Sequence, residues 1–294
     1  MMTNTPVPPS IVEEKIAALE VEEIGNASIR EIVQLVSSIE AATGISYIRM
    51  EMGIPGLPPS QVGVEAEIEA LRNNVASKYP QIDGIPSLKL EASRFVKLFM
   101  NIDVRPEGCI PTVGSMEGSY AAFLVTAARE KEKDTALFID PGFPVQKQQM
   151  LVMNQKYVSF DVFDFRGEKL REKLESYLSK GNICNIIYSN PNNPSWICLT
   201  DDELKIIGEL ADKYDIVVIE DLAYFAMDFR LDLSKPGVPP YQPTVARYTR
   251  NWVMMISSSK VFSYAGQRIG VLIISDQLYH RHSQNLSDRL RVHG

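Results

Sequence analysis

One lysine and one arginine stand eight residues apart in the stretch SSSKVFSYAGQRIG, residues 257–270. The runs VMMI and VLII, which are typical of strands, flank this stretch. An amine such as Lys260 can form an imine with an aldehyde, and a guanidinium such as Arg268 can bind an anion through two hydrogen bonds. A single lysine is more often an ordinary solvated side chain, so other residues must distinguish the two interpretations.

From about residue 110 onward, short apolar runs alternate with helical patterns. The runs lie at 135–140, 156–162, 182–190, 214–221, 252–260 and 270–276, and the helical patterns at 119–133, 144–153, 167–180 and 201–214. Several runs are apolar at successive positions, which is typical of strands that are covered on both faces. The sequence therefore predicts an α/β fold, a three-layer sandwich with a mainly parallel central sheet.

The first hundred residues have a different pattern. Helical periodicity is present at 11–24, 27–42, 64–79 and 87–100, and Asn26 or Ser28 is a suitable N-cap for the second of these helices. A strand is expected at 46–52, directly before a loop rich in glycine and proline at 53–60.

Composition argues against several classes of function. The 294-residue chain has a net charge of −7, which disfavours a nucleic-acid partner or an anionic membrane surface. No run approaches the ~18–20 apolar residues that span a bilayer, and the first ten residues do not resemble a signal peptide. Three cysteines without a CxxC pair predict neither a disulfide framework nor a zinc site. His280 and His282 fit a solvated helix better than a metal site, so we expect a cytoplasmic protein without a metal.

Ligands of parallel sheets bind beyond the carboxyl ends of the strands. Three polar segments follow apolar runs at such ends, namely NPNNPSW at 190–196, DLAY at 221–224 and the serines before Lys260. A GSMEG turn at 114–118 precedes a helix, and PGFP at 141–144 follows another run. Each segment alone could be a turn, a helix cap or a core position. Their joint occurrence at strand ends favours a single binding site.

The phosphate of a ligand is the first group that these residues suit. Small residues at a helix N-terminus, as in the GSMEG turn, leave backbone N–H groups free to bind a phosphate. The Ser257 hydroxyl and the Arg268 guanidinium could complete that anion site.

The remaining residue types suit an aromatic ring that carries an aldehyde. Phe143 could stack on the ring, and a buried Asp221 could keep a ring nitrogen protonated. Asn193 and Tyr224 could hydrogen-bond a ring hydroxylate, while Lys260 could form an imine with the aldehyde. Phosphate, ring, basic nitrogen, phenolic oxygen and aldehyde together describe pyridoxal 5′-phosphate.

At this point the chain resembles a known family, the fold-type I pyridoxal-phosphate enzymes of the class I/II aminotransferases, over residues 25–280. The family motif NPxNP[ST]G is matched by Asn190 to Ser195, the motif DxxY by Asp221 to Tyr224, and SxSKxxxxxGxRxG by Ser257 to Gly270. One position departs from the pattern, because Trp196 stands where the first motif ends in glycine.

The resemblance implies a role for each matching residue. Lys260 would carry the cofactor as a Schiff base and then move a proton as a general base, Asp221 would pair with the pyridinium nitrogen, and Tyr224 would contact the phenolic oxygen. The implied cofactor-binding residues are Ser115, Met116, Phe143, Asn193, Asp221, Tyr224, Ser257, Lys260, Arg268 and, from the neighbouring subunit, Tyr79. Gly53 resembles the loop glycine that closes over the substrate.

The implied function is ping-pong transfer of an amino group between an amino acid and a 2-oxo acid, in a homodimer with shared active sites. A C–S β-lyase, an enzyme similar to 1-aminocyclopropane-1-carboxylate synthase, and a ligand-sensing module remain alternatives. The implied organisation is an N-terminal helical arm at 1–50, a cofactor-binding large domain at 51–280, and the start of a linker helix at 281–294. We expect the small C-terminal domain of the family to be absent from this chain.

Overall fold

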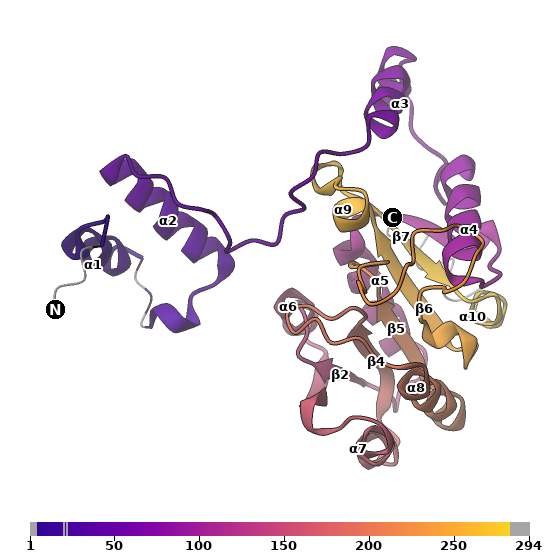
Figure 1. The fold of residues 1–294 in the computed structure, drawn as a ribbon. Coiled ribbons are helices and arrows are strands. Elements are labelled where there is room, and N and C mark those ends of the chain that lie inside the picture. Colours follow the sequence, from indigo (N-terminus) through magenta and orange to yellow (C-terminus); the bar gives the residue numbers. More distant parts are fainter. Residues whose placement is uncertain (1–4, 20, 22, 283–294) are drawn as a thin grey trace. The chain divides into compact units, whose positions relative to one another are not determined.

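The computed structural model describes residues 5–19, 21 and 23–282 (Figure 1). The chain divides into two compact units, Met1–Pro55 and Gly56–Gly294. Of the predicted linker segment at 281–294, residues 283–294 lie outside the described residues.

The first unit is built on the helices α1 (Pro9–Ala17) and α2 (Ile29–Thr43). Of the two predicted caps, Ser28 is the N-cap of α2: its hydroxyl accepts from Glu31 N, and the Glu31 carboxylate accepts from Ser28 N at 2.6 Å. Such a capping box satisfies two backbone donors that a helix start otherwise leaves without partners. The buried residues Leu35 and Ile39 face Val7 and form a small core.

The strand expected at 46–52 was wrong. These residues are all described and form no strand, and the side chains of Ile48 and Met50 are 90% and 85% exposed. An alternating apolar pattern forms a strand only where a neighbouring strand supplies hydrogen-bond partners, and here none pairs with it.

A mixed sheet, seven-stranded within the described residues, forms the centre of the second unit. Its strands are β1 (Cys109–Val113), β2 (Thr135–Asp140), β3 (Lys156–Asp161), β4 (Ile183–Ser189), β5 (Val217–Asp221), β6 (Trp252–Ser257) and β7 (Ile269–Ile274). Their spatial order is β1-β7-β6-β5-β4-β2-β3. The run from β6 to β3 is parallel, while β7 is antiparallel to both of its neighbours. The prediction of a mainly parallel sheet is therefore confirmed.

Helices cover both faces of this sheet. Those that contribute buried residues are α4 (Pro86–Met100), α5 (Ser115–Ala127), α6 (Pro144–Val152), α7 (Glu168–Leu178), α8 (Asp201–Tyr214) and α10 (Asp276–His282). The second unit also contains α3 (Gln61–Arg72) and α9 (Ser258–Val261), which have no buried residue. One buried cluster joins strand residues to α4, α7 and α8, and a second joins alternate strand residues to α5, α6 and α10 (Figure 1). The predicted three-layer α/β sandwich is confirmed.

Strand β5 illustrates why this sheet is stable. All five of its residues are buried, with Val218 in the first cluster and Val217 and Ile219 in the second. Alternate side chains of a strand point to opposite faces, so a strand between two helical layers must be apolar on both. Each buried valine or isoleucine side chain contributes about 1.5–3 kcal/mol. The polar residues that end this strand, Glu220 and Asp221, are the exceptions.

Candidate active site

The strand register brings the predicted polar segments to one edge of the sheet. Ser189, the last residue of β4, is paired with Asp221, the last residue of β5, and Asp221 is paired in turn with Met255 of β6. Ser257, the last residue of β6, is paired with Gly270 of β7. The carboxyl ends of the three parallel strands therefore meet, as the rule for ligand sites in parallel sheets requires.

Two glycines allow Arg268 to approach the start of α5. Gly114 precedes α5 with φ 73°, and a Cβ at this position would lie 2.4 Å from the Nη2 atom of Arg268. A Cβ at Gly270 would lie 2.7 Å from the carbonyl carbon of Gly114 and 2.8 Å from the Thr112 hydroxyl. Only glycine permits such contacts. A guanidinium thus lies beside a helix N-terminus, whose N–H groups lack intrahelical partners, and both attract anions.

Two serine hydroxyls extend this group of donors. The buried Ser257 is the N-cap of α9, where its hydroxyl accepts from Ser259 N at 3.1 Å and donates to Ser259 Oγ at 2.9 Å. Arg268 donates from Nη1 to Ala265 O at 2.8 Å and to Ser259 Oγ at 3.5 Å. We refer to Gly114, the first turn of α5, Ser257, Ser259 and Arg268 as the anion cradle.

Lys260 lies next to the anion cradle. It belongs to the short helix α9, and its side chain is partly buried. Burial and the positive charge of Arg268 lower the pKa of the Lys260 amine. A lower pKa increases the fraction of neutral amine, which is the form that reacts as a nucleophile or accepts a proton.

Asp221 is a buried carboxylate at the end of β5. It accepts hydrogen bonds from Gln146 Nε2 at 2.8 Å and from Ala223 N at 3.0 Å. Both of these donors are neutral, and burial raises the pKa of Asp221 to about 6. A ligand cation placed here would stabilise the ionised carboxylate, and the carboxylate would in turn keep that cation protonated.

Tyr224 and Asn193 lie in the loops that follow β5 and β4. Burial and the negative charge of Asp221 raise the pKa of the Tyr224 phenol. The ring of Trp196 contacts the Tyr224 ring edge-on, with 5.5 Å between centroids. Asn193 is partly buried, and its backbone N–H donates to the Ser189 hydroxyl at 3.3 Å.

Other predicted residues lie at the boundaries of these elements or apart from them. Ser115 and Met116 form the first turn of α5, where the Met116 carbonyl accepts from Gln149 Nε2 at 2.8 Å. The partly buried Phe143 is the N-cap of α6. Tyr79 is fully exposed, and Gly53 belongs to the first unit. The roles of these residues stay predictions.

Gln146 and Ser259 were not among the predicted site residues, although Ser259 is the second serine of the matched motif SxSK. Gln146 lies in the first turn of α6 and is buried because its amide donates to Asp221. Its position just after PGFP was the only available signal, and glutamine in a first helical turn is not unusual. Ser259 was visible in the sequence as one of three serines before Lys260, but its bond to Arg268 depends on the tertiary fold.

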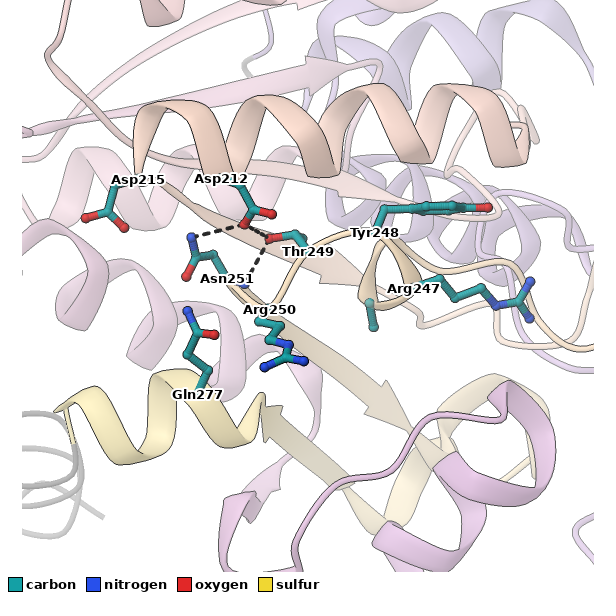
Figure 2. A pocket seen from close by; sticks show the side chains of 9 residues that line it. Asp212, Asp215, Arg247, Tyr248, Thr249, Arg250, Asn251 and Gln277 are labelled. Atoms are coloured by element: carbon teal, nitrogen blue, oxygen red, sulfur yellow. Dashed lines mark hydrogen bonds between the residues drawn. The ribbon is translucent and has the colours of Figure 1, made fainter.

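A cavity of about 570 Å³ lies at the opposite edge of the sheet (Figure 2). It is lined by residues that precede β5 and β6 and by Gln277 of α10. Figure 2 shows the Asp212 carboxylate accepting from the Thr249 hydroxyl at 2.5 Å and from Asn251 Nδ2 at 3.4 Å. Asp215, also on this cavity, forms an ion pair with Arg129 at 2.7 Å. Asp212, Thr249 and Asn251 bond to one another, and the lining of this cavity includes neither Lys260 nor Asp221, so size alone does not make it the reactive site.

Metal and membrane functions gain no support from the described part of the chain. Within it, no group of three or more His, Cys, Asp or Glu residues is placed to hold a metal ion. The helices of the same residues are too short or too polar to cross a bilayer.

Comparison with known protein families gives one clear result. The model of the family described as aminotransferase class I and II matches residues 46–291. A probable aspartate aminotransferase of Methanocaldococcus jannaschii is 24% identical over 272 residues, which are 92% of this chain and 66% of the relative. The glutamate-pyruvate aminotransferase of Escherichia coli is 29% identical over 236 residues, 78% of this chain and 54% of the relative.

Solved structures agree at the level of the fold. The alanine aminotransferase of Pyrococcus furiosus superimposes with a TM-score of 0.74 at 20% identity, covering 94% of this chain and 67% of that structure. The aspartate aminotransferase of Thermus thermophilus with maleate gives a TM-score of 0.70 at 18% identity, covering 94% and 67%. Against the two curated relatives above, the chain spans 54% to 66% of their length.

Proposed function

Because the chain belongs to the class I and II aminotransferases, we propose that it transfers an amino group between an amino acid and a 2-oxo acid with pyridoxal 5′-phosphate as cofactor. The transfer would run as two half-reactions in a ping-pong order. The names of the relatives support this reaction class, since they include aspartate, LL-diaminopimelate and glutamate-pyruvate aminotransferases. The chain spans only part of their length, so the activity is proposed for the whole protein.

The main support is the contrast between the two ends of the candidate site. At one end, a buried carboxylate has neutral donors and a raised pKa, so it matches a protonated ring nitrogen. At the other, Gly114 leaves just enough space for a guanidinium at a helix N-terminus, so the cradle matches a phosphate. Lys260 belongs to the helix that Ser257 of the cradle caps, and its pKa is lowered. These features fit the shape and charges of pyridoxal 5′-phosphate.

Each residue of the candidate site would have a distinct role in the reaction. The bound cofactor supplies an electron sink that stabilises negative charge at the substrate Cα. Asp221 would hold the ring nitrogen protonated, and Asn193 with Tyr224 would hydrogen-bond the phenolic oxygen. Arg268 and the other cradle groups would hold the phosphate and fix the ring. Lys260, with its lowered pKa, would move a proton between the substrate Cα and the former aldehyde carbon of the cofactor, in opposite directions in the two half-reactions.

The half-reactions can be observed separately by absorbance. We expect an amino acid alone to shift the cofactor absorption band, and a 2-oxo acid alone to restore it. A C–S β-lyase would instead release pyruvate and ammonia from a β-substituted amino acid, without any need for a 2-oxo acid. A sensing module would bind the amino acid without producing either change. The last two results would each contradict the proposal.

We also propose that two copies of the chain share their active sites, with Tyr79 reaching the phosphate of the neighbouring subunit and Gly53 lying over the substrate. The complete exposure of the Tyr79 ring is compatible with a role in another subunit. Mixing inactive Lys260→Ala and Tyr79→Ala proteins tests this arrangement. Hybrid dimers should regain activity, because one of their two sites contains both native residues. Mixtures that stay inactive although hybrids form would contradict it.

A further inference from the structure

Trp196 has a backbone conformation that suits glycine better than tryptophan. Its φ is 58°, in the left-handed region that bulky residues rarely adopt. The turn around it is closed by hydrogen bonds from Trp196 N to Asn192 O at 3.0 Å and from Asn192 N to Ile197 O at 2.9 Å. The Asn192 side chain also accepts from Ser195 Oγ at 2.7 Å. A large side chain is therefore kept at a strained position that the rest of the turn fixes.

The indole of Trp196 connects Tyr224 with a second aromatic ring. It meets the Tyr224 ring edge-on and stacks on the Phe229 ring, with 6.0 Å between centroids and 20° between planes. Trp196 is 42% exposed and Phe229 is 82% exposed, whereas Tyr224 is partly buried beside Asp221. Tyr224, Trp196 and Phe229 thus form a continuous aromatic wall that leads from the partly buried Tyr224 to the exposed Phe229.

The backbone on both sides of Phe229 is anchored. The buried Asp228 accepts from Arg230 Nε at 2.8 Å and from Arg230 Nη2 at 2.7 Å, and also from Arg230 N at 3.2 Å. Such a two-pronged ion pair fixes the loop while the Phe229 ring between its members stays in solvent. An exposed phenylalanine that is stacked on an exposed tryptophan leaves apolar surface ready for a ligand.

We propose that Trp196 and Phe229 bind the side chain of the substrate amino acid, and that they favour aromatic or large apolar side chains. This inference rests on the proposed function, since it assumes that the substrate reacts beside Asp221 and Tyr224. The side chain of an amino acid that reacts there would lie next to Trp196 and Phe229, at the exposed end of the aromatic wall. Aromatic faces bind planar and apolar groups by stacking and by excluding water.

Kinetics with paired amino donors test this specificity. Trp196→Ala should lower kcat/KM for L-phenylalanine by about tenfold or more but that for L-alanine by less than about threefold, because only the larger side chain reaches the wall. Phe229→Ala should act in the same direction with a smaller effect. Phe163→Ala is the matched control, since Phe163 is 76% exposed on the short helical turn after the edge strand β3 and does not belong to the aromatic wall. Equal losses of kcat/KM for both amino acids would overturn the proposal. They would mean that Trp196 only supports the position of the Tyr224 ring.

A binding measurement tests the aromatic wall without turnover. Trp196 and the buried Trp252 are the two tryptophans of the chain, so Trp252→Phe leaves Trp196 as the single indole reporter. In the cofactor-loaded variant, 3-phenylpropionate should change the indole emission at concentrations about tenfold lower than propionate does. The same titration with both ligands equally effective, or with neither, would overturn the inference. If the wild-type protein transfers no amino group at all, the proposed function fails, and this titration still tests the wall.

Discussion

The carboxylates at the two edges of the sheet, Asp212 and Asp221, have different surroundings. At the amino edge, the exposed Asp212 accepts from Thr249 and Asn251 beside the cavity of Figure 2. At the carboxyl edge, Asp221 is buried with two neutral donors, and its pKa is raised to about 6. A ligand cation placed beside Asp221 would stabilise its ionised form. This difference between the edges supports the proposal that Asp221 binds a ligand, whereas Asp212 is part of the scaffold.

The largest effect is expected at Lys260, the amine of the carboxyl edge. Lys260→Ala removes both the nucleophile and the proton carrier, so turnover should fall on the order of 10³-fold or more. The cofactor should still bind through the anion cradle. Steady-state amino transfer measures the loss, and Lys205→Ala on the exposed surface of α8 is the control. Near-normal turnover in Lys260→Ala would remove the chemical distinction between the two edges.

Exchanging the two aspartates for their amides tests the comparison itself. Asp221→Asn should lower turnover by about 10²-fold, because an amide no longer keeps the ring nitrogen protonated. Asp212→Asn should leave turnover unchanged and cost about 1 kcal/mol of stability through a weaker hydrogen bond. Parallel kinetics and denaturant unfolding measure both quantities. If Asp212→Asn inactivated the protein and Asp221→Asn did not, the ligand would bind at the amino edge of the sheet and the proposal would be wrong.

A pair of glycines on α5 and at its N-cap probes the cradle. In Gly114→Ala the new methyl group would meet the Arg268 guanidinium at 2.4 Å, so cofactor affinity should fall by about tenfold or more. In Gly118→Ala the nearest atoms, those of Met255, are 3.5 Å away, which is an ordinary contact, and affinity should change by less than about threefold. Titration of each apoprotein with pyridoxal 5′-phosphate gives the two dissociation constants. Similar constants would show that the cradle is not where the phosphate binds.

The smallest effect on turnover is expected at Glu220, the neighbour of Asp221 that points to the other face of the sheet. Glu220 is fully buried and accepts from the Tyr188 and Thr244 hydroxyls and from Val245 N. Burial raises its pKa to about 7 from the ordinary 4.5. Between these values the folded protein keeps a proton that the unfolded chain releases, so stability decreases as the pH rises from about 4.5 to 7.

Glu220→Gln should remove this pH dependence and leave turnover within about twofold of the wild type. The free energy of unfolding of the variant relative to the wild type should therefore increase between pH 5 and pH 8, by at most about 3 kcal/mol. Denaturant unfolding at the two pH values measures this change. A constant difference across the range would mean that Glu220 is not protonated in the folded protein.

Much of the fold could be predicted because its strands are buried on both faces. The runs that became β2, β5 and β6 are continuously apolar until a polar segment begins, and Asn185 alone interrupts that of β4, so the sequence marked both the strands and their carboxyl ends. Strand β1 was missed because CIPTV is short, contains a proline and pairs only with β7. The false strand at 46–52 had the right composition but no neighbour. Pairing depends on tertiary structure, which local patterns do not contain.

The candidate site likewise contains residues that the sequence could predict and residues that only the folded structure shows. Lys260, Asp221 and Arg268 were found because their motifs directly follow strands. Gln146 was not found, because its contact with Asp221 depends on how α6 packs over β5. Gly114 was part of a turn that the sequence marked. The folded structure shows why this residue is a glycine, because the Arg268 guanidinium occupies the space that a Cβ would take.

Borohydride reduction of the cofactor-loaded protein is the most direct test of the central claim, which is that the carboxyl edge holds pyridoxal 5′-phosphate on Lys260. Reduction fixes the cofactor to the amine that holds it, and peptide mass spectrometry then identifies that amine. We predict a single modified peptide that contains Lys260, and no modification in Lys260→Ala. A cofactor fixed to a different lysine, or unchanged labelling of the Lys260→Ala protein, would contradict the account.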